Sequence, residues 1–282
     1  MDVSTRQWEG IRRDVATAGD RFAALVEAAA ADRRATRHWS VADTAAHVAS
    51  LTDLDAVITR AYPDPAFPLP DVHEQWRRTT VDRVDLLNVA VMRSFGERDP
   101  GTLAARIRAD CTAMLDATRH VEASAPLPWL GSSTLTMAGL LAHIVNEFHI
   151  HGRDIARAAG LPHVVPPAEA APFFEVFFVG LVRDGYGHLL DTAKALPDVR
   201  VAVAFESRYT HPVTLLLAGN VVSVADPGTP PDVRVTYDPV VFNLMLFGRV
   251  SAVRAALSGG VRVGGPRPWL LPAFMRKVRC PK

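Results

Sequence analysis

The sequence has few of the features that mark secreted, membrane or nucleic-acid-binding proteins. Its 282 residues include two cysteines, Cys111 and Cys280, too few for a disulfide framework or a cysteine-rich metal site. No uncharged apolar run reaches the ~18 residues that a membrane-spanning helix needs, and the stretch 173–182 is interrupted by Glu175. The first ten residues lack the apolar core of a secretory signal. We therefore expect a soluble cytoplasmic protein.

Excess charge is also absent. Lysine and arginine number 31 against 30 aspartates and glutamates, which gives a formal net charge of +1 and indicates no polyanionic partner such as nucleic acid. A chain of this length is more typical of two domains than of one, and each could bury its own core. The composition leaves the oligomeric state open.

The first 160 residues show helical periodicity. Ser4 is placed to cap an opening helix, and Ser40 with Asp43 has the spacing of a capping box. The predicted helices follow Ser4, run from Ser40 towards Arg60, cover 72–95 and 101–121, and extend from Thr136 to Gly160. Proline-rich breaks are expected at 62–70 and 125–133. Four substantial helices among these segments predict a bundle.

The pattern changes in the second half. Four prolines between 162 and 172 predict a linker or rigid turn, and a helix is expected at 173–193. Short runs rich in valine come next and predict strands at 199–205, 213–217, 221–224, 233–237 and 261–263. Residues 239–257 are again helical in pattern. The sequence thus predicts an α+β protein with a mainly antiparallel sheet, divided into domains 1–162 and 163–282.

Ionisable side chains form a stripe on the helix that begins near Thr136. His143, Glu147 and His151 are spaced at i, i+4 and i+8, which places them on one face of a helix whose apolar residues point the same way. Burying such groups is costly unless they are paired, hydrogen-bonded or bound to a metal. The stripe therefore predicts either a metal site or a buried i,i+4 pair.

A further histidine lies in the apolar stripe of the helix that begins after Ser40. His47 has apolar residues at i+4, i+7 and i+11, so its imidazole is expected to face the core, where it could meet Glu147 and His151. Two histidines and one carboxylate suit a catalytic Zn²⁺, although Fe, Ni and Mn use similar ligands. His143 is open to three roles: ligand, hydrogen-bond donor to a ligand, or part of a substrate pocket. Asp154 could orient an imidazole or cap a nearby donor, or it could simply pair with a neighbouring arginine.

Two segments resemble a known family. The segment 39–49, WSVADTAAHVA, resembles the motif W-[ST]-x-x-[DE]-x-x-x-H of mycothiol-dependent maleylpyruvate isomerase-like proteins. The segment 143–156, HIVNEFHIHGRDIA, resembles that family's H-x-x-x-E-x-x-x-H-x-x-D element. More loosely, the segments DVRV (232–235), LFGR (246–249) and ALSGGVRVGG (256–265) are similar to the sterol-carrier-like domain of these proteins.

The resemblance carries expectations about fold and chemistry. It implies a DinB-like four-helix bundle in which His47, Glu147 and His151 bind a divalent metal, expected to be Zn²⁺, followed by a sterol-carrier-like domain. It also implies mycothiol as a thiol cosubstrate that the metal activates for isomerisation of, or transfer to, an electrophilic small molecule. His143 is a candidate catalytic residue. Arg249 is a candidate for catalysis and for binding a carboxylate of the thiol or of the substrate, with a solvated arginine at a helix end as the alternative.

Two other functions fit the sequence. One is a carrier without catalysis, in which Phe173, Phe174, Phe177 and Phe178 line an apolar pocket, although their spacing is equally that of a helix core. The other keeps the metal and performs hydrolysis through a bound water.

Overall fold

The computed structural model describes residues 3–64, 70–193 and 198–281, so part of the predicted break at 62–70 lies outside the described residues. The chain divides into two compact units. Unit 1 comprises 1–76, 86–127 and 136–165, and unit 2 comprises 77–85, 128–135 and 166–282. Two segments from the first half of the chain thus belong to the unit that contains the sheet.

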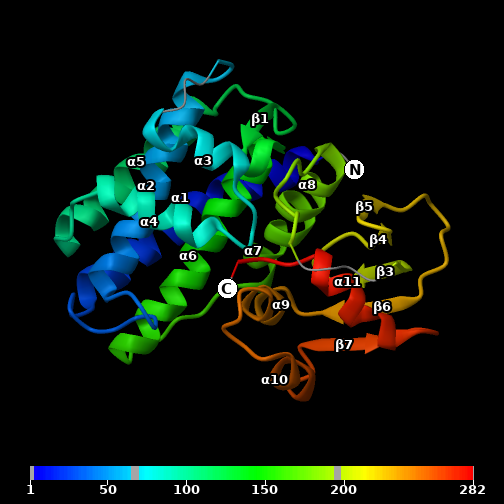
Figure 1. Ribbon diagram of the computed structural model, residues 1–282. Helices are drawn as coiled ribbons and strands as arrows, with labels where there is room; N and C mark the ends of the chain where they lie inside the picture. The colour runs from blue at the N-terminus through cyan, green and yellow to red at the C-terminus, as the bar shows by residue number, and fades with distance from the viewer. Residues whose placement is uncertain (1–2, 65–69, 194–197, 282) are drawn as a thin grey trace. The chain divides into compact units, whose positions relative to one another are not determined.

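Four long helices form the core of unit 1, and Figure 1 shows them as the blue-to-green part of the chain. Their bounds are α1 Thr5–Ala28, α2 Val41–Ala61, α5 Pro100–Ala117 and α6 Met137–Ala159. Both α1 and α2 pack along α5 and along α6, so the four helices surround one core. The predicted helical bundle is confirmed.

Side-chain caps set the ends of these helices. Ser4 and Ser40 each form a capping box, and Thr136 accepts a hydrogen bond from Gly139 N at the start of α6. Gly160 ends α6 in the left-handed conformation with φ 71°, which a residue without Cβ adopts at little cost. These are the boundaries that the sequence predicted. They determine where the helical turns of α2 and α6 begin, and so which side chains of these helices face the core.

Unit 2 is built on a five-stranded sheet in the order β5-β4-β3-β6-β7. The strands are β3 Arg200–Glu206, β4 Val213–Ala218, β5 Val221–Val224, β6 Val233–Tyr237 and β7 Val261–Gly264. All neighbours are antiparallel except β3 and β6, which pair in parallel with Val203 opposite Val233. The expected mainly antiparallel sheet is confirmed, and so is the α+β class with helices first and sheet second.

Helices and a cluster of aromatic side chains complete unit 2. The helices are α7 Pro167–Pro172, α8 Val179–Asp184, α9 Pro239–Leu246, α10 Ala252–Leu257 and α11 Leu271–Lys277, with a short 3₁₀ turn η4 Pro268–Leu270. Between α7 and α8 lies the π-helical segment η3, Phe173–Phe178. Its four phenylalanines are buried, and Phe174 lies 4.8 Å from Phe205 and 5.2 Å from Phe242 between ring centroids. They pack as core.

Three local predictions were wrong. The expected helix 72–95 is a 3₁₀ turn η1 (Pro70–Val72) and two helices, α3 His73–Arg78 and α4 Val84–Ser94. The expected loop 125–133 contains β1 Pro126–Trp129 and η2 Leu130–Ser132, and β2 Ser133–Thr136 pairs with β1. Proline is tolerated in such short edge strands because no inner ladder needs its missing N–H.

The third wrong prediction concerns 162–193. The helix expected at 173–193 begins at Pro167 and ends at Asp184, before Gly185. Pro172 lacks an N–H and leaves a carbonyl of the preceding turn without its usual bond, and the backbone widens to the π form directly after it. No helix in the described ranges has both the length and the apolar character required to cross a bilayer.

Candidate metal centre

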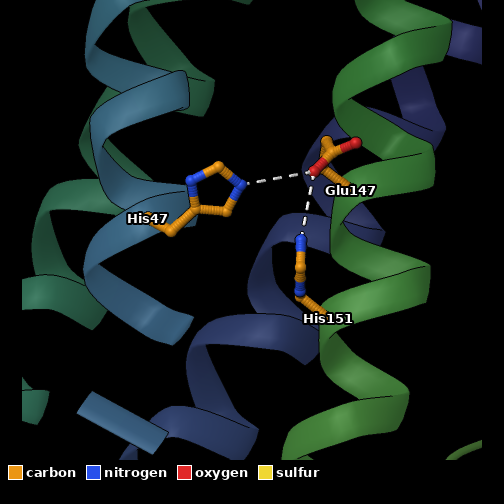
Figure 2. Close-up of side chains that lie close together, drawn as sticks. All are labelled: His47, Glu147 and His151. Atoms are coloured by element: carbon orange, nitrogen blue, oxygen red, sulfur yellow. Dashed lines mark ion pairs between the residues drawn. The ribbon is translucent and has the colours of Figure 1, made fainter. Parts of the chain in front are cut away.

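Two helices of the bundle bring three metal-binding side chains together. His47 comes from α2, and Glu147 and His151 come from successive turns of α6 (Figure 2). One donor atom from each residue lies within 4.8 Å of the others, and all three residues are buried. The three side chains therefore lie close together, as predicted, while their role as metal ligands stays a prediction.

The distances suit an ion held between the three donors. Glu147 Oε2 lies 3.3 Å from His151 Nε2 and 3.8 Å from His47 Nε2. Tetrahedral ligands ~2.1 Å from a zinc ion lie roughly 3.4 Å from one another, whereas a direct N–H···O hydrogen bond is optimal near 2.9 Å. The chemistry of the set, two imidazoles and a carboxylate, is also that of a three-residue zinc site with an open fourth position.

Burial and mutual contacts set the charge of these groups. Burial lowers the pKa of His47 and of His143, which favours the neutral imidazole that can donate a lone pair. Burial alone would raise the pKa of Glu147, but its contacts with the His151 and His47 imidazoles outweigh burial and hold that pKa well below its usual range. The site thus combines a carboxylate with the His47 imidazole in an environment that favours its neutral form, and metal binding requires both of these protonation states.

Two further residues of α6 contact this group. His143 Nε2 lies 3.5 Å from Oε1 of Glu147, the oxygen other than the one that faces His47 and His151. Asp154 Oδ2 lies 3.6 Å from Nδ1 of His151, close enough for its charge to act on that ring. The structure thus brings both predicted neighbours to the centre, and it places His143 beside Glu147 without making it one of the three close donors.

One buried carboxyl group near the centre was missed. Asp55 on α2 is 1% exposed, and its Oδ2 has no hydrogen-bond partner among the described residues. Burial, and after it the negative charge of Glu147, raises the pKa of Asp55 well above its ordinary value. The signal was in the sequence, because Asp55 comes eight residues after His47 and so lies on the same helical stripe.

The other predicted residues lie elsewhere. Arg249 belongs to unit 2, where it is half-buried and its Nη1 donates to Phe247 O at 2.9 Å. Its proposed role in binding the thiol or substrate stays a prediction. Cys111 is buried in the bundle, where burial raises the pKa of its thiol to about 12. A thiol of that kind is a poor nucleophile at neutral pH.

Comparisons with known proteins show a similarity of fold. No protein family and no curated protein matches the sequence. Among solved structures, a point mutant of the mycothiol-dependent maleylpyruvate isomerase matches with a TM-score of 0.50 and 12% identity, over 91% of this chain and 92% of that one. A second structure of that isomerase matches with a TM-score of 0.49 and 13% identity over the same shares. The chain therefore has the fold of the first of these structures.

Proposed function

We propose that this protein is a metal-dependent enzyme that activates a low-molecular-weight thiol for reaction with an electrophilic small molecule. The observation that carries the proposal is the buried meeting of His47, Glu147 and His151 on two helices of the bundle. The shared fold with a mycothiol-dependent isomerase supports mycothiol as the thiol. The sequence motifs 39–49 and 143–156 support the same assignment independently of the fold.

The three residues have distinct parts in the proposed chemistry. A divalent cation, expected to be Zn²⁺, would supply the positive charge that lowers the pKa of a bound thiol and favours its thiolate. Glu147 contributes the negative charge that offsets the cation, and the two neutral imidazoles contribute lone pairs without adding charge. Asp154 orients the ring of His151. The chain itself needs no reactive cysteine, which agrees with the burial of Cys111.

The outcome of the reaction depends on the fate of the carbon–sulfur bond. The sulfur of the thiolate adds to one carbon of an activated C=C bond of the substrate, and the π electron pair moves to the conjugated carbonyl group. If the C–S bond breaks after rotation about the resulting C–C single bond, the C=C bond re-forms, the thiolate leaves and the outcome is isomerisation. If the adduct instead takes up a proton and persists, the thiol stays attached to the substrate and the outcome is transfer. We propose His143 as a polar residue that contacts the substrate next to Glu147, and Arg249 as a residue that binds a carboxylate of thiol or substrate.

The first prediction concerns metal and turnover together. Metal-stripped protein dialysed against zinc should retain about one ion per chain, whereas Glu147→Gln should retain almost none because it loses the charged ligand. Loaded wild type should convert an electrophile such as maleylpyruvate only when mycothiol is present, and His151→Ala should not. Elemental analysis and a thiol-dependence assay make the two measurements.

The control is His120→Ala, which removes an exposed imidazole from unit 1 outside the cluster. It should bind zinc and turn over as wild type does. Equal metal content in wild type and Glu147→Gln would contradict the metal site. A metal-loaded protein that gives no thiol-dependent reaction across a broad panel of electrophiles would contradict the enzyme.

A further inference from the structure

One aromatic side chain contacts both histidines of the centre. The indole of Trp39 lies 4.8 Å from the His47 ring and 6.3 Å from the His151 ring between centroids, tilted by 42° and 41°. The two imidazoles lie 5.1 Å apart and nearly perpendicular, at 82°. Distances of this size are those of aromatic rings in contact. Trp39 thus packs against one ring from each of the two helices that form the centre.

The backbone around Trp39 is held on several sides. Ala35 N and Thr36 N both donate to Trp39 O at 3.1 Å, and Trp39 N donates to the Thr36 hydroxyl at 3.1 Å. The residue after it, Ser40, is the N-cap of α2. The turn 33–40 is therefore a closed loop directly joined to the helix that carries His47.

The same loop is tied to the end of α6. Arg157 on α6 donates through Nη2 to Ala35 O at 3.1 Å, and Arg33 donates through Nη1 to Ala158 O at 2.8 Å. One side chain thus reaches from the helix to the loop and the other from the loop to the helix. Trp39 consequently keeps a fixed position relative to both α2 and α6.

Ring packing is one of the contacts that surround the His47 imidazole. Histidines that bind metals usually donate their second ring nitrogen to a carboxylate or carbonyl, which fixes the ring orientation. Asp154 lies beside His151, with its Oδ2 3.6 Å from Nδ1, a separation longer than a hydrogen bond. Among the described residues, contacts of the His47 ring include Glu147 through Nε2, and His151 and Trp39 through ring packing. Of the two rings, the indole is the nearer to His47, at 4.8 Å between centroids against 5.1 Å for His151.

We propose that Trp39 is a positioning residue of the metal centre, whose indole holds the His47 imidazole with Nε2 directed at Glu147. It acts on His47 by ring packing, as Asp154 acts on His151 by charge. The inference rests on the metal-binding part of the proposed function and on none of its thiol chemistry. It adds a sixth residue to the group His47, His143, Glu147, His151 and Asp154.

The test measures metal binding without any substrate. Trp39→Ala should weaken zinc binding about 10–100-fold in competition with a chelator, the usual effect of losing a group that orients a ligand. In protein loaded with Co²⁺, the visible absorption bands should shift because the ligand geometry has changed. Trp39→Phe, which keeps a flat ring, should restore both the affinity and the spectrum.

Two variants separate positioning from simple packing. Trp39→Leu fills much of the space with a flexible apolar side chain, and it should resemble Trp39→Ala. Trp8→Ala removes a half-buried indole from α1, where it contacts Arg12, and it should bind metal as wild type does. Wild-type affinity and an unchanged cobalt spectrum in Trp39→Ala or Trp39→Leu would overturn the inference. A wild type that binds zinc but performs no thiol reaction would overturn the proposed enzyme and leave this inference standing.

Discussion

At the scale of single residues, the burial of Asp55 predicts how the stability of the protein depends on pH. Its pKa is raised by burial first and by the charge of Glu147 second. The folded protein therefore keeps a proton that the unfolded chain loses above the ordinary pKa of ~3.9. The contribution of this group to stability is full below that value and is lost as the pH rises towards the folded-state pKa.

Asp55→Asn removes this titration from metal-free protein. Relative to wild type, the variant should gain free energy of unfolding as the pH rises above ~4, by at most ~1.4 kcal/mol per pH unit. Urea unfolding at a series of pH values gives the difference. Asp53→Asn is the control, because it removes a half-buried carboxylate from the same helix. Parallel pH profiles for Asp55→Asn and wild type would disprove the expectation.

The residues of the centre differ in how far the sequence predicts them. His143, Glu147 and His151 share one face because helical spacing alone places them there, and the cap at Thr136 fixes where that helix begins. The distances from Glu147 to His47 could not be predicted in this way, since they depend on how α2 packs against α6. The contact of Trp39 with His47 depends further on the hydrogen bonds of an irregular loop. Periodicity says nothing about such loops.

At the scale of helices, replacing either of two glycines of α1 by alanine should change the stability in opposite directions. A Cβ at Gly19 would lie 2.7 Å from Cys111 Sγ and 3.4 Å from the Phe148 ring, whereas at Gly10 it would meet only the end of the Arg13 side chain at 3.8 Å. Gly19→Ala should destabilise the protein by ~1–3 kcal/mol through overpacking. Gly10→Ala should stabilise it by up to ~1 kcal/mol, because alanine favours the helix.

Chemical denaturation of both variants measures these effects. Cys111→Ala combined with Gly19→Ala should recover part of the loss, since the atom that the new methyl group meets has been removed. If Gly19→Ala proved as stable as Gly10→Ala, the close approach of α1 to α5 and α6 would be refuted.

Elements with side-chain caps or clear alternation were predicted well, and the others were not. Ser40 and Gly160 mark real helix ends because their local chemistry acts within one turn. The strand β1 was not predicted because it contains Pro126 and Pro128, and proline is unfavourable in a strand unless that strand is short and at an edge. The π-helical segment at 173–178 has the same spacing of apolar residues as an ordinary helix, so no periodicity distinguishes it.

At the scale of the whole molecule, metal binding should stabilise the fold. A ligand that binds only the folded state adds RT ln(1 + [L]/Kd), which is ~4 kcal/mol at a thousandfold excess over Kd. Because domains of 150–250 residues gain roughly 2–4 °C in Tm per kcal/mol, adding zinc to metal-free protein should raise the Tm clearly.

Calorimetry with zinc, with magnesium and with neither provides the comparison. Magnesium prefers oxygen ligands and octahedral geometry, so it should leave the Tm unchanged. His151→Ala should show no response to zinc. The same Tm for wild type with and without zinc, in protein shown to be metal-free at the start, would count against a buried site.

The discontinuous make-up of unit 2 has a consequence for how the chain is synthesised. Val81 N donates to Leu189 O at 2.9 Å, Thr134 N donates to Gly185 O at 2.8 Å, and Asp82 pairs with Arg279, 197 positions later. All six residues lie in unit 2. Because translation proceeds from the N-terminus, the segments 77–85 and 128–135 leave the ribosome well before these partners. The two segments therefore wait for their partners, and Asp82 waits until Arg279 has emerged.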